Sequence, residues 1–150
     1  MSEKLLSYLK ENSVDAEHLV FEKSCHSVQE AADAIGTSPD NFVKSICMIS
    51  NDKPIIAIVK GEDRASTSRV EKLMNIDRPK LATPEQILEM TGYPCGGTPP
   101  LGFNAIFLID EKVMDNEFVY AGGGTEKSLL KISPLEIKRI TNGVVGRIRK

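Results

Sequence analysis

The sequence has no tryptophan, two histidines and three cysteines among its 150 residues. The number of cysteines is odd, which argues against a disulfide framework. None of Cys25, Cys47 and Cys95 forms a C-x-x-C pair, which argues against a zinc site. Two histidines are too few to favour a metal site built from imidazoles. We therefore expect reduced thiols, no metal and no cofactor.

Long apolar runs are also missing. No run approaches the roughly 18 residues of a membrane span, and the acidic start of the chain does not have the pattern of a signal peptide. An apolar fraction of 41% excludes a disordered chain. The length suits one domain, residues 1–150, with a core of its own. We expect a soluble cytoplasmic protein with no membrane partner.

Charge is unevenly distributed, although the net charge is only −2. Residues 1–126 carry 12 basic and 20 acidic side chains, whereas residues 127–150 carry seven basic side chains and one acidic one. A basic segment of this kind can meet a polyanion such as nucleic acid. The alternative is a solvated helix face followed by a basic tail.

Helical and strand patterns alternate along the chain. With their capping residues, the expected helices cover residues 2–10, 27–36, 38–44, 68–74, 83–92 and 133–143. The expected strands cover residues 17–23, 46–50, 55–60, 81–82, 105–109, 118–121, 129–132 and 144–148. Hairpin-like pairs between helices, in place of strict β-α-β units, predict an α+β fold with a mixed sheet and flanking helices.

Lys44 stands at the expected end of the helix at 38–44, just before the strand at 46–50. A lysine there can complement the negative end of the helix dipole. It can equally reach from the mouth of a sheet into a cleft. Both interpretations remain open at this stage.

Two segments hold more glycine than an ordinary loop needs. Residues 92–102 contain four glycines and three prolines, which suits a rigid loop that aims bare N–H groups at a ligand, as an oxyanion hole does. Residues 122–124 are three successive glycines after a strand, where a ligand-facing wall and a β-bulge are the alternatives. Neither segment contains a phosphate-binding or dinucleotide-binding motif.

These features occur in an order that resembles the YbaK family of aminoacyl-tRNA deacylases, which are related to the editing domain inserted in bacterial prolyl-tRNA synthetase. The resemblance covers about residues 26–145. It depends on the segment 27–32, Lys44, the loop 92–102, the glycines 122–124 and the helix that begins at Ser133-Pro134. It implies a single α+β domain with a curved mixed β-sheet flanked by helices.

The resemblance also implies a site. Lys44 matches the family's lysine, and Gly96 and Pro100 match the fixed positions of its G-x-x-x-P loop, so these three are expected at the catalytic centre. The expected substrate-binding residues are His26, Ser45, Gly97, Thr98, Pro99, Gly123 and Gly124.

The implied activity is hydrolysis, in trans, of the ester of a mischarged tRNA, specifically a tRNA for proline that carries a small wrong amino acid. The implied partners are the acceptor end of tRNA and an aminoacyl-tRNA synthetase. A non-catalytic tRNA- or synthetase-binding module on the same fold is the alternative. Ser45 stands where alanine-specific members carry asparagine, and residues 64–68 replace a Leu-Asp-Leu segment, so the amino acid removed stays open.

A cysteine hydrolase is a third possibility, because Cys95 lies in the loop 92–102 and Cys25 precedes His26. Neighbours in a strand point to opposite faces, and no third group that would orient the histidine is evident. We therefore expect each cysteine to be a small buried side chain, His26 to be a turn or cap residue, and no covalent enzyme intermediate.

Overall fold

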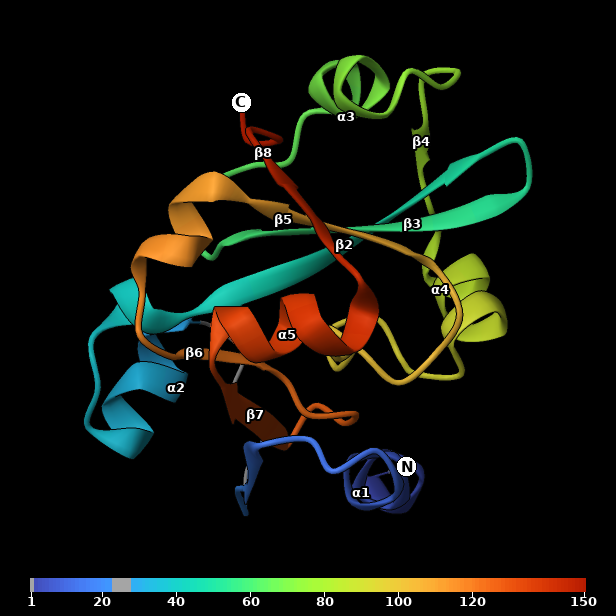
Figure 1. The fold of residues 1–150 in the computed structure, drawn as a ribbon. Helices are drawn as coiled ribbons and strands as arrows, with labels where there is room; N and C mark the ends of the chain where they lie inside the picture. The colour runs from blue at the N-terminus through green and yellow to red at the C-terminus, as the bar shows by residue number, and fades with distance from the viewer. Residues whose placement is uncertain (1, 23–27) are drawn as a thin grey trace.

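The computed structural model describes residues 2–22 and 28–150 (Figure 1). The helices are α1 (Ser2–Glu11), α2 (Val28–Ile35), α3 (Thr67–Met74), α4 (Pro84–Thr91) and α5 (Pro134–Thr141), with the 3-10 helices η1 (Pro39–Asn41) and η2 (Glu111–Asp115). The strands are β1 (Ala16–Val20), β2 (Val43–Ser50), β3 (Lys53–Lys60), β4 (Lys80–Leu81), β5 (Ile106–Asp110), β6 (Val119–Gly122), β7 (Ser128–Ile132) and β8 (Val144–Gly146). None of the helices described is long and apolar enough to cross a membrane.

The strands form two sheets. Five of them lie in the order β4-β2-β3-β5-β8, with antiparallel pairs at β2 and parallel pairs on both sides of β5, and β1-β7-β6 form an antiparallel sheet. An isolated parallel bridge between Phe42 and Tyr120 joins the two sheets. The α+β class with a mixed sheet is therefore confirmed, and the strands divide between two sheets because β1 pairs with β7 instead of with the central strands.

Local signals set most element boundaries. Asn51 and Asp52 both have positive φ (49° and 62°) and form the two-residue turn of the predicted β2–β3 hairpin. Thr83 and Gln86 form a reciprocal capping box at the start of α4, and Gly92 ends that helix at φ 80°. The expected cap of α2, Ser27, lies outside the described residues.

The helix expected over residues 38–44 is wrong in extent. Only residues 39–41 turn, as η1 behind the Ser38 cap, and the backbone is extended from Phe42 onward. The cause is long-range pairing, because the Phe42 carbonyl accepts a 2.8 Å hydrogen bond from Gly61 beyond the end of β3. Lys44 therefore lies inside β2, which excludes the helix-dipole interpretation.

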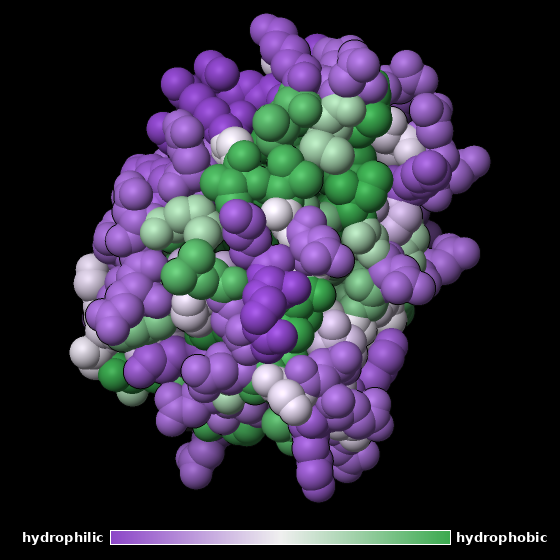
Figure 2. Space-filling model, in the orientation of Figure 1, coloured by the Kyte–Doolittle hydropathy of each residue, from purple (hydrophilic) through white to green (hydrophobic). Residues whose placement is uncertain are grey.

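The core covers both faces of the five-stranded sheet. Ile56 and Ile58 of β3 face the larger cluster, which includes residues of α1, α4, α5 and the three-stranded sheet. Ile55, Ala57 and Val59 face a second cluster, which includes a residue of α3. A strand buried on both faces explains the unbroken apolar run of β3. On the outside, Figure 2 shows apolar side chains gathered on part of the face on which β8 lies.

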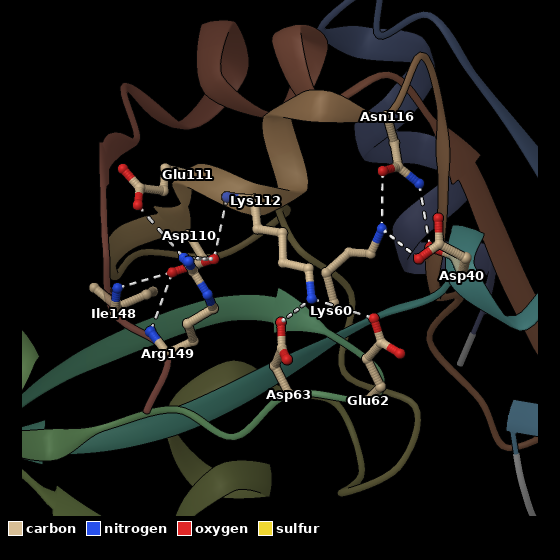
Figure 3. A network of polar contacts seen from close by, with 10 residues as sticks. All are labelled: Asp40, Lys60, Glu62, Asp63, Asp110, Glu111, Lys112, Asn116, Ile148 and Arg149. Atoms are coloured by element: carbon tan, nitrogen blue, oxygen red, sulfur yellow. Dashed lines mark hydrogen bonds and ion pairs between the residues drawn. The ribbon is translucent and has the colours of Figure 1, made fainter.

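The basic C-terminal segment is tied to the sheet and does not form a free tail. The carboxylate of the fully buried Asp110 accepts hydrogen bonds from the backbone N–H groups of Ile148 and Arg149, at 2.9 and 3.1 Å (Figure 3). It also forms an ion pair with the Arg149 guanidinium at 2.9 Å. The Lys150 N–H donates to the Arg64 carbonyl at 2.8 Å. The Arg149 charge is therefore compensated within the protein.

Candidate functional site

A cavity of about 490 Å³ opens along one edge of β2. Residues 42–47 form one wall, and β4 with the start of α4 contributes apolar side chains beside them. The opposite wall comes from the two glycine-rich segments, with Gly96 and Thr98 from one and Gly122 from the other. The structure thus brings together four of the predicted site residues, namely Lys44, Ser45, Gly96 and Thr98.

The two glycine-rich segments pack against each other by their backbones. The Gly124 N–H donates to the Gly97 carbonyl at 2.8 Å. A Cβ atom on Gly97 would come within 2.8 Å of the Thr125 carbonyl carbon, and one on Gly122 would overlap the Thr98 carbonyl oxygen. Close backbone contact therefore requires glycine at positions 122 and 123, and a φ of 97° favours it at position 124.

Gly96 is the exposed tip of its loop and has a φ of 89°, a conformation that favours glycine. The neighbouring Gly97 N–H donates to the Pro94 carbonyl at 3.0 Å, and the Thr98 hydroxyl donates to the same carbonyl at 3.0 Å. Within residues 2–22 and 28–150, the backbone N–H groups of Gly96 and Thr98 have no acceptor. Both residues line the cavity, and no protein acceptor competes for their N–H groups within the described residues.

Lys44 is partly buried and lines the same cavity. It has no ion pair among the described residues. Lys60, the last residue of β3, lies across from the start of β2 in the same hairpin and, unlike Lys44, has partners for its charge. It is 3% exposed and bonds to Asp40 at 3.0 Å and to Asn116 at 2.9 Å (Figure 3). Lys44 therefore presents to the cavity a positive charge that has no ion-pair partner among the described residues.

Other predicted site residues lie behind the cavity wall. Pro99 and Pro100 are buried at the base of the loop, next to the packed glycines, and Gly123 donates its N–H to the Ser128 carbonyl at 3.2 Å. His26 lies outside the described residues. Pro100 is thus positioned to hold the loop and does not itself line the cavity.

Two residues at the site could not be predicted from the sequence, because no local pattern marks them. His18 of β1 bonds through its Nε2 to the Gly123 carbonyl at 2.8 Å, and Glu126 lines the cavity from the turn after β6. Both depend on the pairing of β7 with β1 and β6, which brings distant segments together. Strand pairing of this kind is not encoded in any local motif.

Cys47 and Cys95 both line the cavity. Burial, together with the nearby Cys95, raises the pKa of Cys47 to about 11, so this thiol stays protonated at neutral pH and is a poor nucleophile. The expectation of a buried thiol is wrong for Cys95, which is exposed because its loop turns outward. No histidine of the described chain lines the cavity, and no cluster there of three or more His, Cys, Asp or Glu side chains is arranged to hold a metal ion.

The cavity therefore combines a cation without an ion-pair partner, N–H donors without a protein acceptor and the Glu126 carboxylate, and no cysteine–histidine pair lines it among the described residues. Such a set can bind an anionic group and stabilise negative charge that develops on an oxygen atom. The nucleophile would then be water or a hydroxyl of the bound molecule.

Comparison with known proteins places the chain among editing domains. The family model of the aminoacyl-tRNA editing domain matches residues 22–140. The proline–tRNA ligase of Nitratidesulfovibrio vulgaris strain DP4 is 31% identical over 81 residues, which are 54% of this chain and 14% of the ligase. That of Endomicrobium trichonymphae is 25% identical over 142 residues, 94% of this chain and 25% of the ligase. The chain thus spans a quarter or less of the length of these ligases.

Solved structures agree over nearly the whole chain. The crystal structure of hypothetical protein APE2540 has a TM-score of 0.89 and 29% identity, and the match covers 98% of this chain and 99% of that one. A protein described as a candidate trans-editing enzyme for prolyl-tRNA synthetase has a TM-score of 0.88 and 25% identity, with 99% and 96% covered. The resemblance to YbaK proteins is confirmed, and the chain belongs to the aminoacyl-tRNA editing domain family.

Proposed function

We propose that the chain, as one domain, is a trans-acting deacylase that hydrolyses the ester of a mischarged tRNA. The observation that carries the proposal is the meeting of the unpaired Lys44 cation with the free N–H groups of Gly96 and Thr98 in one cavity. The substrate supplies matching chemistry, since the end of tRNA carries phosphates and the ester carbonyl becomes negatively charged during hydrolysis.

In this reaction Lys44 binds a phosphate or the ribose of the terminal nucleotide. The N–H groups of Gly96 and Thr98 donate to the carbonyl oxygen as water attacks the carbonyl carbon, and each such donor is worth about 2.7–4 kcal/mol in comparable sites. The carbon–oxygen bond to the ribose breaks, and the ribose oxygen takes up a proton. Free amino acid and uncharged tRNA are the products.

The cavity also limits which acyl groups fit. Its walls include Cys47, Ala82, Ile87 and Ala121, which are apolar or only weakly polar. We propose a small amino acid on a tRNA for proline as the substrate, in line with the proline–tRNA ligases and the trans-editing protein that the chain resembles. Sorting by size alone is worth only about 1–3 kcal/mol per methylene, so neighbouring small residues should differ by modest factors.

The proposal is tested with tRNA for proline charged in turn with alanine, cysteine, serine, threonine and proline. Single-turnover hydrolysis of at least one of them faster than the spontaneous rate supports the deacylase. Binding of tRNA with no acceleration for any ester would instead identify a non-catalytic tRNA-binding module.

A further inference from the structure

The edge of β2 that faces the cavity is unpaired at Ser45. On its other edge, β2 pairs with β3 along its full length. On the cavity edge, β4 pairs only with residues 48–49, and β6 reaches only the bridge between Phe42 and Tyr120. Between these two points, no strand of the described chain pairs with Ser45 on the cavity edge.

The register of the hairpin fixes the direction of the main-chain groups of Ser45. A two-residue turn makes its flanking residues, Ser50 and Lys53, a hydrogen-bonded pair. Such pairs recur at every second residue of an antiparallel ladder. The even-numbered residues of β2 therefore bond to β3, and the odd-numbered ones point their N–H and C=O groups away from it.

Two observed hydrogen bonds agree with this alternation. The Phe42 carbonyl accepts from Gly61, on the β3 side, at 2.8 Å. The Cys47 carbonyl accepts from Ala82, on the β4 side, at 2.9 Å. Ser45 is odd-numbered and lies between them, so its N–H and C=O point to the cavity edge.

The side chain of Ser45 adds a third unsatisfied group. Its Oγ is buried and has no hydrogen-bond partner among the described residues. Buried hydroxyls in folded proteins nearly always have a partner. The main-chain N–H and C=O of Ser45 thus face the cavity without a strand partner, and its unpartnered hydroxyl lies buried beside them. A free donor and acceptor side by side indicate a ligand with its own donor and acceptor.

An aminoacyl ester has this pattern at the right spacing. Its α-ammonium and its carbonyl flank one carbon atom, just as the N–H and C=O of a residue in a strand do. In an antiparallel hydrogen-bonded pair, two residues exchange both bonds. We propose that Ser45 binds the acyl group of the substrate as a strand one residue long. Its C=O accepts from the α-ammonium, and its N–H donates to the ester carbonyl oxygen in addition to the N–H groups of Gly96 and Thr98.

This arrangement separates the two ends of the substrate. Paired residues in a sheet place their side chains on the same face, and the face of Ser45 also carries Cys47. Cys47, Ile87 and Ala121 belong to the larger core cluster and line the cavity, so the acyl side chain would meet this apolar wall. Lys44 leaves β2 on the opposite face and lines the cavity from that side, where it remains available for the tRNA.

The proposal rests on the proposed deacylase function and adds that the α-amino group is recognised whatever the side chain. The test uses one tRNA esterified with alanine, lactate or propionate. At the α-carbon, alanine offers an ammonium donor, lactate offers a hydroxyl donor and propionate offers no donor. If another amino acid is the best substrate, its own hydroxy and deamino analogues take their place. Each enzymatic rate is divided by the spontaneous rate of the same ester. We expect the enhancement to fall in that order, with propionate at least about tenfold below alanine.

Equal enhancement of the alanyl and propionyl esters would overturn the role of Ser45 and leave the deacylase intact. No enhancement of any aminoacyl ester would overturn the deacylase itself. Two variants locate the effect: Ser45→Ala removes only the Oγ, whereas Ser45→Pro also removes the N–H that points away from β3 and breaks no β2–β3 bond. We expect a larger loss of enhancement for S45P than for S45A. Equal losses would contradict the main-chain bond, and if S45P does not fold, the ester series decides alone.

Discussion

The backbone N–H of Gly124 donates a 2.8 Å hydrogen bond to the carbonyl of Gly97. This bond joins two loops that the sequence marks separately by their glycine content. Because a Cβ on Gly97 would press on the backbone of Thr125 and one on Gly122 would overlap the backbone of Thr98, the two loops contact each other backbone to backbone. The bond therefore links the position of Gly96, at the tip of one loop, to the packing of the other.

Gly122→Ala should separate the two loops. Its Cβ would overlap the Thr98 carbonyl oxygen, and overpacking of this kind costs about 3 kcal/mol of unfolding free energy. Gly36→Ala is the control, since Gly36 has a φ of 69° but no neighbouring atom within 4 Å, so only conformational strain of about 1–2 kcal/mol is expected. Urea unfolding of both variants measures the difference, and equal losses would contradict the close contact.

Lys44→Ala should reduce single-turnover deacylation by about a hundredfold, as removal of one charge-stabilising donor does elsewhere. Because Lys44 forms no ion pair within the described chain, the melting temperature should hardly change. Lys53→Ala, at the exposed turn end of the same hairpin, controls for the loss of a positive charge. A Lys44→Ala protein with full activity would show that this lysine serves no catalytic purpose.

The sequence predicts most of the elements because their boundaries are local. The Thr83 cap, the Gly92 stop and the turn at residues 51–52 each act within a few residues. The sequence predicts too long a helix before Lys44, because the hydrogen bond that holds Phe42 in an extended conformation comes from Gly61, far along the chain. Short-range patterns cannot contain that information.

The candidate site also has parts that the local sequence indicates and parts that depend on long-range pairing. Glycine density indicates the two loops, but only the family resemblance points to Lys44 and Gly96 as a pair. The free edge at Ser45 cannot be predicted from any motif, since it results from where β4 and β6 stop pairing with β2. The exposure of Cys95 likewise depends on how its loop turns at the cavity mouth.

Asp110→Ala should release the C-terminal segment. Asp110 is fully buried, and its carboxylate accepts bonds from the backbones of Lys112, Ile148 and Arg149 and from the Arg149 guanidinium. Removing one partner of a buried ion pair costs about 3–5 kcal/mol. Glu111→Ala is the matched control: this residue pairs with the same guanidinium at 3.5 Å but is 58% exposed, so its loss should cost less than about 1 kcal/mol. Similar losses in denaturant unfolding would contradict the assignment.

Stability should decline in acid partly through Glu136. The bond from the Arg139 guanidinium, followed by that from the Asp15 N–H, lowers the pKa of Glu136 from 4.5 to about 2. A folded-state pKa below the unfolded one means that the carboxylate stabilises the fold above pH 4.5, and that this contribution is lost as the pH falls from 4.5 towards 2.

Arg139 is 56% exposed, so solvent screens the pair and the loss should be about 1 kcal/mol. Glu136→Gln should be less stable than wild type near neutral pH and approach it at about pH 2–3. Glu89→Gln, an exposed change on α4, should follow the wild type throughout. A constant gap between Glu136→Gln and wild type at all pH values would contradict the linkage.

Charge reversal of the C-terminal segment should weaken tRNA binding through Arg147 and Lys150 only. Both are exposed, whereas the Arg149 charge is compensated by Asp110 and Glu111. If both exposed residues touch phosphates, the Arg147→Glu/Lys150→Glu protein should lose about 0.7–0.9 per contact from the log–log slope of affinity against salt. Filter binding at several salt concentrations measures that slope, with Lys10→Glu on α1 as a control of equal sign. An unchanged slope would mean that these side chains are only solvated and that the tRNA contacts lie around Lys44.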